Sequence, residues 1–167
     1  MNEICELFDS RLNTLAQLID RASLYFANDN FLAFRLVEDM LPLGTQVAFT
    51  CNQPHNFAQW VRGEEVVNLD PDVKTAAQAK ELISATRSAL TLVDVQSTTL
   101  PEGKRLDFGP QRYAELSGDK YVRDFLVPNF YFHLVTTYDI LRANGLEIGK
   151  ANYMAHLLGR VKERSDA

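Results

Sequence analysis

The sequence has few cysteines, no excess of basic residues and no long hydrophobic run. Two cysteines, Cys5 and Cys51, are too few for the disulfide framework of a small secreted domain, so a reducing, cytoplasmic compartment is expected. There are 17 basic and 22 acidic residues, which give a net charge of −5. Nucleic acids and anionic membranes are bound by clustered positive charge, so neither is expected as a partner.

No membrane-spanning or targeting segment is expected either. The most apolar stretch, residues 125–135, is too short to cross a bilayer and contains Pro128, Asn129 and His133. The first ten residues are acidic and lack the basic region and apolar core of a signal peptide.

Glycine and proline are also scarce, with 8 and 6 residues, which excludes a collagen-like or low-complexity chain. Hydrophobic residues make up 46% of the sequence, which excludes intrinsic disorder. A chain of 167 residues is long enough to bury roughly 70% of its unfolded surface in one core. We therefore expect a single domain over residues 1–167.

The hydrophobic pattern is mainly helical. Apolar residues recur at three- and four-residue steps in four long segments, and a shorter helix is expected near the C-terminus. The predicted helices cover residues 3–26, 42–63, 76–93, 119–144 and 150–158, and residues 31–38 are expected to form an irregular or extended link. Pro54 predicts a kink or a second helix in two pieces, and Pro128 predicts an interruption of the fourth.

Residues 96–117 differ from this pattern and predict a small β-hairpin. Thr and Leu residues flank Pro101-Glu102-Gly103, which is typical of a turn, and Gly109-Pro110 would close the hairpin. The predicted fold class is thus all-α, a four-helix bundle with a small β-hairpin inserted before the last long helix. Its helices are expected to be largely antiparallel where the connections are short.

Polar residues interrupt the apolar stripe of the fourth helix. Asn129, His133 and Thr136 fall on one face, with Val122, Leu126 and Ile140 above and below them. A buried polar group without a partner costs about 1–3 kcal/mol, so these three must be hydrogen-bonded. Gln46 lies on the apolar stripe of the second helix, as Thr50 does, and it could meet Asn129 and His133 if the two helices face each other.

The opposite side of the fourth helix is apolar as well, so the helix should be covered all round. Val127, Phe130, Tyr131 and Leu134 belong to this side. A homodimer would provide the cover, and residues 148–158 of the same chain are the alternative.

Two segments carry a family resemblance. DMLPLGTQVAFTCN and the combination PNFYFH, ILRANG and GK are similar to the patterns of an uncharacterised bacterial family. The likeness extends from about residue 36 to 154. That family resembles a branch of the DinB/YfiT-like superfamily of four-helix bundles. The resemblance implies a DinB-like bundle; many superfamily members hold a divalent metal through three histidines, and some are thiol-dependent transferases or isomerases.

The metal pattern of the superfamily is incomplete in this chain. Aligned by the resemblance, its three histidines correspond to Gln46, Asn129 and His133, so one imidazole remains. Neutral amide oxygens are weak ligands for transition metals, so no cofactor is expected, and zinc or nickel is disfavoured. A remaining alternative is a metal held by His133 together with water or a distant carboxylate such as Asp39.

Other catalytic patterns are missing. His55, His133 and His156 do not form an HxxxH pair, and neither GxSxG, SxxK nor a glycine-rich phosphate loop occurs. Cys51 lies on an apolar stripe, which is typical of an inert core thiol.

The sequence does not name a function and does not decide whether the protein is an enzyme. One hypothesis is a metal-free DinB-like protein with a binding or structural role. The alternative is a transferase- or isomerase-type enzyme in which His133, aided by Asn129 and Gln46, acts on a small polar or thiol substrate, with or without a divalent metal.

Overall fold

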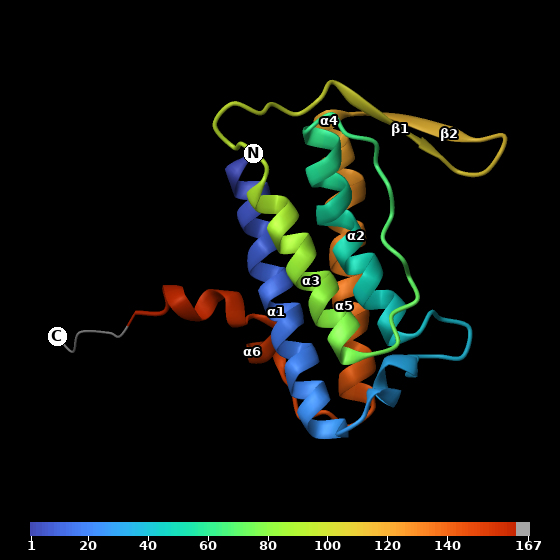
Figure 1. The fold of residues 1–167 in the computed structure, drawn as a ribbon, viewed down its shortest axis with the longest axis vertical. Helices are drawn as coiled ribbons and strands as arrows, with labels where there is room; N and C mark the ends of the chain where they lie inside the picture. The colour runs from blue at the N-terminus through green and yellow to red at the C-terminus, as the bar shows by residue number, and fades with distance from the viewer. Residues whose placement is uncertain (163–167) are drawn as a thin grey trace.

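The fold is a bundle of four long helices, described for residues 1–162 in a computed structural model (Figure 1). The four are α1 (Asn2–Phe26), α2 (Leu43–Val61), α3 (Ala76–Thr91) and α5 (Val127–Ala143). The core is built from their apolar faces and includes the fully buried side chains of Phe8, Leu12, Val47, Phe57 and Phe130. The predicted four-helix bundle with a hairpin before the last long helix is confirmed.

The helices pair in an order that differs from their order in the chain. α2 packs chiefly against α5 and α3, α1 packs chiefly against α3, and the consecutive helices α1 and α2 touch little. α1 and α5 run in one direction and α2 and α3 in the other (Figure 1). The parallel arrangement of α2 and α3 is also seen at both ends of the pair. Gly44, at the start of α2, lies directly against the carbonyl of Val73, and Arg62, after its end, donates to the Ala89 carbonyl at 2.9 Å.

A long connection over residues 62–75, here called the strap, makes this parallel arrangement possible. It leaves one end of α2 and returns along that helix to the start of α3 (Figure 1). Four hydrogen bonds from one edge of α2 hold it: Thr45 to the Pro71 carbonyl, Asn52 to the Leu69 N–H, Asn56 to Asn68, and Gln59 to the Val67 N–H. The strap therefore occupies the polar edge of α2.

Two prolines affect the long helices differently. α2 continues through Pro54 as one helix, so of the two expected outcomes, a kink or a helix in two pieces, the second was wrong. The helix loses only one N–H donor at Pro54. Before Pro128, the helical pattern does change. A short α4 (Gly118–Lys120) leads into a π-helical segment, η2 (Tyr121–Leu126), where the Val127 N–H bonds to the Val122 carbonyl. Pro128 then lies in the first turn of α5, where its missing N–H is tolerated.

The hairpin is present, but its turn is not the predicted one. β1 (Gly103–Asp107) and β2 (Tyr113–Ser117) are antiparallel, and their register pairs Gly103 with Ser117 and Asp107 with Tyr113. The turn spans residues 108–112, where Gly109 has a φ of 85°, a conformation that glycine adopts without steric cost. Pro101-Glu102-Gly103 instead leads into β1.

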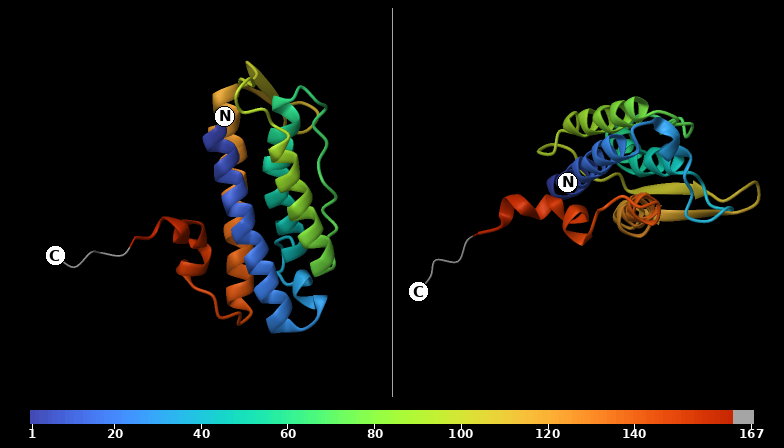
Figure 2. Two further views of the ribbon diagram at one scale, coloured as in Figure 1. Left: turned by 60° about the vertical axis from the view of Figure 1, so that its left-hand side comes forward. Right: turned by 90° about the horizontal axis from the view of Figure 1, so that it is seen from below.

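Short helical turns replace two predicted segments. The link after α1 contains a 3-10 turn, η1 (Asp29–Ala33), and the predicted helix 150–158 is divided into α6 (Lys150–Tyr153) and a 3-10 segment, η3 (Ala155–Arg160). The chain leaves the end of α5, returns beside α1 and then projects from the bundle (Figure 2). Residues 163–167 of the predicted charged end lie outside the described residues.

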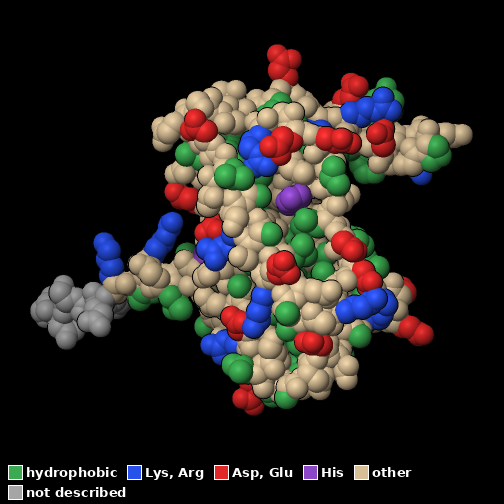
Figure 3. Space-filling model, in the orientation of Figure 1, with side chains coloured by type: hydrophobic (Ala, Val, Ile, Leu, Met, Phe, Trp, Pro, Cys, Tyr) green, Lys and Arg blue, Asp and Glu red, His purple; other side chains and the backbone are tan. Residues whose placement is uncertain are grey.

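Surface charge is mixed on the face shown in Figure 3, where acidic and basic side chains are interspersed over the bundle and the hairpin. Within residues 1–162, the helices are either too short or too polar to cross a membrane.

Candidate functional site

The candidate site lies where α2 and α5, the most extensively packed pair of helices, face each other. Gln46 is in the first turn of α2 and His133 is in the second turn of α5. Oε1 of Gln46 and Nδ1 of His133 are 2.8 Å apart, which is a hydrogen-bond distance. The structure thus brings together two of the three residues that the sequence singles out.

The orientation of the Gln46 amide is fixed from its other side. Its Nε2 donates to the carbonyl of Leu41 at 3.2 Å, and only 2% of Gln46 is exposed. Pro42, the residue before α2, has an extended backbone, which leaves the Leu41 carbonyl at the helix start for this bond. Because Nε2 faces Leu41, Oε1 faces His133, and the hydrogen-bond network assigns the imidazole proton to Nδ1.

Two aromatic rings flank the imidazole. The rings of Phe49 and Phe132 each have their centroid 5.2 Å from that of His133, and both meet it edge-on. Phe49 is half-buried and Phe132 is 57% exposed, so the imidazole lies near the surface of the molecule, between α2 and α5. Sequence reasoning missed both phenylalanines, although Phe49 lies one turn after Gln46 on α2 and is the residue that this spacing would indicate.

Burial sets the charge of His133. It lowers the pKa of the imidazole from 6.5 to about 4, because the cation loses hydration. The other ring nitrogen, Nε2, has no hydrogen-bond partner within residues 1–162 and is not among the fully buried unpartnered atoms, so it is open to solvent. At neutral pH, the site therefore presents a neutral imidazole with an acceptor lone pair.

Asn129 lies one turn before His133 on the same face of α5 and is half-buried. Its Nδ2 donates to the Phe125 carbonyl of its own helix at 2.7 Å, and within residues 1–162 it forms no hydrogen bond with Gln46 or His133. Thr136 and Thr50 likewise donate to carbonyls four residues earlier in their helices. The requirement that these polar groups be hydrogen-bonded is met, but mostly within single helices.

The donor set fits a transition metal poorly. The Oε1 of Gln46 is engaged by His133, and the amide of Asn129 is bonded to its own helix. Among residues 1–162, there is no group of three or more His, Cys, Asp or Glu side chains that could hold an ion. His55 faces Arg62 and Glu64 near the end of α2, His156 is on η3, and Asp39 is exposed in the link before α2.

Cys51 is fully buried, and burial raises the pKa of its thiol to about 12. A thiol that stays protonated is a poor nucleophile, so the thiol of Cys51 is chemically inert in the folded protein.

Comparison with known proteins identifies the relatives of this bundle. The model of a family described as a domain of unknown function, DUF1993, matches residues 2–154. The chain belongs to the DUF1993 family. A crystal structure of a DinB family member from Shewanella denitrificans shares the fold with a TM-score of 0.76 and 25% sequence identity, over 90% of this chain and 88% of that one. No curated protein matches the sequence.

These matches place this DUF1993 chain in the DinB-like superfamily, as its sequence motifs predicted. Neither match names an activity. Where the resemblance implies three histidines, the DUF1993 chain has a hydrogen-bonded Gln46–His133 pair with Asn129 beside it.

Proposed function

We propose that this DUF1993 protein binds a small polar ligand at the Gln46–His133 pair, without a bound metal. The observation that carries this proposal is the 2.8 Å contact between Oε1 of Gln46 and Nδ1 of His133, which leaves Nε2 of the imidazole without a partner within residues 1–162. A fixed acceptor of this kind is complementary to a ligand that donates an O–H, N–H or S–H group.

The low pKa of His133 favours binding over acid–base catalysis. General acid–base catalysis is most efficient when the pKa of the group lies near the working pH. An imidazole with a pKa of about 4 is neutral at pH 7, so it accepts hydrogen bonds well but is a weak base. The enzymatic alternative requires that a ligand raise this pKa, which the experiment below would detect.

The surroundings of the imidazole also suit a small ligand. Phe132 is largely exposed beside the ring and offers an apolar contact, while the half-buried Asn129 offers its Oδ1 as an acceptor one turn away. A few polar groups beside aromatic side chains are typical of small-molecule sites.

The test is a titration of the full chain, labelled with ¹⁵N in histidine, with a panel of small alcohols, amides and thiols. Binding is expected to shift the Nε2 resonance of His133 in a saturable way. The same ligand should raise the melting temperature of the wild type but not that of folded His133→Gln. A panel without any saturable shift would leave His133 with a structural role only and would overturn the proposal.

A variant of Gln46 tests whether the side chain at this position contacts Nδ1 of His133. Gln46→Glu places a carboxylate beside Nδ1, so the pKa of His133 should rise above its usual value of about 6.5. Gln17→Glu, which adds the same charge at an exposed position of α1, is the matched control and should leave that pKa in place.

The absence of metal is tested separately. Elemental analysis of protein purified without chelator is expected to find no stoichiometric zinc or nickel, because one imidazole and two amides are a weak donor set. One equivalent of either metal per chain would overturn this part of the proposal.

Two further expectations belong to this proposal. A second copy of the chain would cover the exposed side chains of Phe132 and Val135 on α5, which are 57% and 39% exposed. The protein would work in a reducing, cytoplasmic compartment, which is compatible with its free thiols, Cys5 and Cys51.

A further inference from the structure

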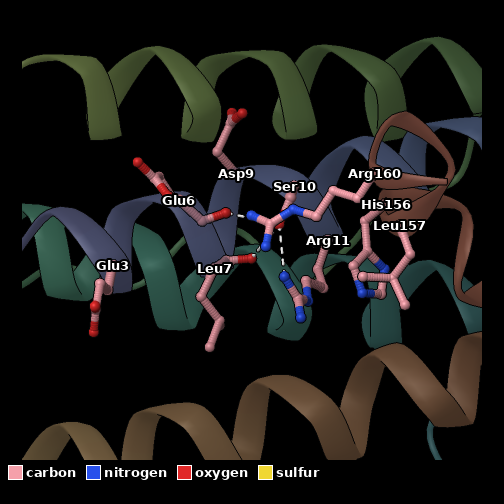
Figure 4. Close-up of a pocket in the computed structure, with 9 residues that line it drawn as sticks. All are labelled: Glu3, Glu6, Leu7, Asp9, Ser10, Arg11, His156, Leu157 and Arg160. Atoms are coloured by element: carbon pink, nitrogen blue, oxygen red, sulfur yellow. Dashed lines mark hydrogen bonds between the residues drawn. The ribbon is translucent and has the colours of Figure 1, made fainter. Parts of the chain in front are cut away.

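A cleft separate from the α2–α5 site lies between the N-terminal half of α1 and the segment η3 (Figure 4). Its volume is about 630 Å³, which is within the range of small-molecule sites. The carboxylates of Glu3, Glu6 and Asp9 belong to its lining, as do three groups of the opposite character, Arg11, His156 and Arg160. None of these residues belongs to the site proposed above.

The guanidinium of Arg11 has an unusual environment. Its Nη1 donates to the Ser10 hydroxyl at 2.8 Å, but its Nε is buried and has no hydrogen-bond partner within residues 1–162. Nδ1 of His156, on the facing segment, is also buried without a hydrogen bond. Figure 4 shows the Arg11 guanidinium and the His156 ring side by side. Buried donors are nearly always satisfied by protein, water or ligand, so the Nε–H of Arg11 calls for an acceptor.

The acidic residues of the cleft do not supply this acceptor. Asp9 is paired with Arg87 of α3, with contacts of 2.7 and 3.2 Å, and Glu6 accepts from Asn2 at 2.7 Å. Glu3 lies at the far end of the cleft from His156 (Figure 4). Within residues 1–162, Arg11 and Arg160 form no ion pair. In the described part of the chain, the two guanidinium groups thus lack a direct carboxylate partner, although three carboxylates line the cleft.

From this geometry we infer that the α1–η3 cleft binds a small oxyanion, a carboxylate or phosphate group, between Arg11, His156 and Arg160. A guanidinium presents parallel N–H donors that match the paired oxygens of such a group. Arg11 supplies Nε, which is buried and unused, His156 supplies a second donor, and Arg160 adds charge from the rim.

The field of the two cations reaches His156. Burial lowers the pKa of its imidazole, and Arg11 and Arg160 lower it further. The Tyr153 backbone acts in the opposite direction, although Nδ1 makes no hydrogen bond of regular geometry. A bound anion would offset the effect of the two cations and so raise the pKa of His156.

The experiment titrates the full chain, labelled with ¹⁵N in arginine, with inorganic phosphate, acetate and, as an ionic-strength control, chloride. Phosphate or acetate is expected to shift the Arg11 Nε–H resonance in a saturable way, whereas chloride is not. Whichever of phosphate and acetate binds with the higher affinity identifies the class of anion. A shift that rises linearly with all three salts would overturn the inference.

Three variants make the test specific. Arg11→Gln should weaken anion binding about tenfold or more, because it removes a hydrogen bond to a charged group. If Arg11→Gln does not fold, Arg11→Lys, which keeps the charge but loses Nε, takes its place. Arg142→Gln, which removes an exposed cation on α5, should bind as the wild type does. Equal affinity in the Arg11 and Arg142 variants would contradict the assigned site.

Discussion

At the scale of single residues, the contact between Gln46 and His133 determines the tautomer of the imidazole, and burial of the ring determines its charge. The bond from Gln46 to the Leu41 carbonyl directs the amide oxygen toward the ring, and the packing of Phe49 and Phe132 limits its hydration. The ring is therefore an acceptor by default, and its protonation opposes folding.

The first prediction concerns the dependence of stability on pH. The folded-state pKa of His133 is about 4, below the value of about 6.5 in an unfolded chain. Between these values, the unfolded chain binds a proton that the folded protein does not, so stability is complete above pH 6.5 and is lost as pH falls toward 4. Urea unfolding at pH 7.5 and at pH 5 measures how much unfolding free energy is lost between these two pH values. This loss should be larger in wild type than in His133→Gln by up to about 2 kcal/mol.

His55 and His156 are common to both proteins, so their titration cancels in this comparison. If wild type and His133→Gln lose the same unfolding free energy between pH 7.5 and pH 5, the pKa of His133 is not depressed.

A second prediction concerns the two thiols. Cys51 is fully buried and its pKa is raised to about 12, whereas Cys5 is half-buried. A thiol-labelling reagent should therefore modify native Cys51→Ala at the wild-type rate and leave native Cys5→Ala unmodified. In urea, both variants should react fully. Labelling of Cys51 in the folded protein would show that the α2–α3 interface opens.

Single residues were the hardest to predict from the sequence. Helical spacing correctly placed Gln46 and His133 on facing stripes, because the stripe follows from the helix period. The same argument suggested that Gln46 could meet Asn129 as well, but Asn129 bonds to the Phe125 carbonyl of its own helix. Asparagine can satisfy itself on its own helix or across to another, and periodicity does not distinguish the two.

At the scale of elements, the strap depends on side chains of α2. Asn52 is only 5% exposed, and its Oδ1 accepts from the Leu69 N–H at 2.7 Å. Asparagine and glutamine at this edge replace the hydrogen bonds that an irregular segment would otherwise make with water.

The third prediction tests this role. Asn52→Ala leaves the Leu69 N–H without its acceptor and should reduce the free energy of unfolding by about 1–2 kcal/mol. Gln53→Ala is the matched control, because Gln53 bonds only to the Phe49 carbonyl of its own helix, at 3.3 Å, and should cost less than about 0.5 kcal/mol. Chemical denaturation measures both. Equal losses would mean that the strap is held by its apolar contacts alone.

The elements themselves were largely predictable because the helices have strong apolar periodicity and clear boundary residues. Thr75 caps α3 in the expected way and forms a capping box with Gln78. The hairpin turn was misplaced because Pro-Glu-Gly and Gly-Pro are both turn-forming sequences, and strand pairing decides between them. The parallel course of α2 and α3 has no local signature, since a long polar segment fits either direction.

At the scale of the whole molecule, the outer face of α5 is partly covered by the chain itself. Tyr153 of α6 packs edge-on against Tyr138, with ring centroids 5.9 Å apart, but Phe132 and Val135 stay exposed. The chain's own C-terminal segment therefore covers part of this face, and the dimer stays a proposal for the exposed remainder.

The fourth prediction follows from that exposed patch. Light scattering coupled to gel filtration should give the mass of a dimer, and Phe132→Ser should shift the distribution toward the monomer of 18.9 kDa. Leu24→Ser, at an 85% exposed position on α1, is the matched control and should leave the mass unchanged. A wild-type monomer at all concentrations would contradict the proposed dimer.

The order of helix pairing has a consequence for how quickly the chain acquires its structure. In a simple up-and-down bundle, each helix docks on its sequence neighbour, and most contacts close short loops. Here the extensive pairs are α2 with α5, α1 with α3, and α2 with α3 across the strap. For each pair, the chain between the two helices must first be closed into a loop. The conformational entropy lost in this closure is offset only when the helices pack. This bundle should consequently fold more slowly than up-and-down bundles of equal length.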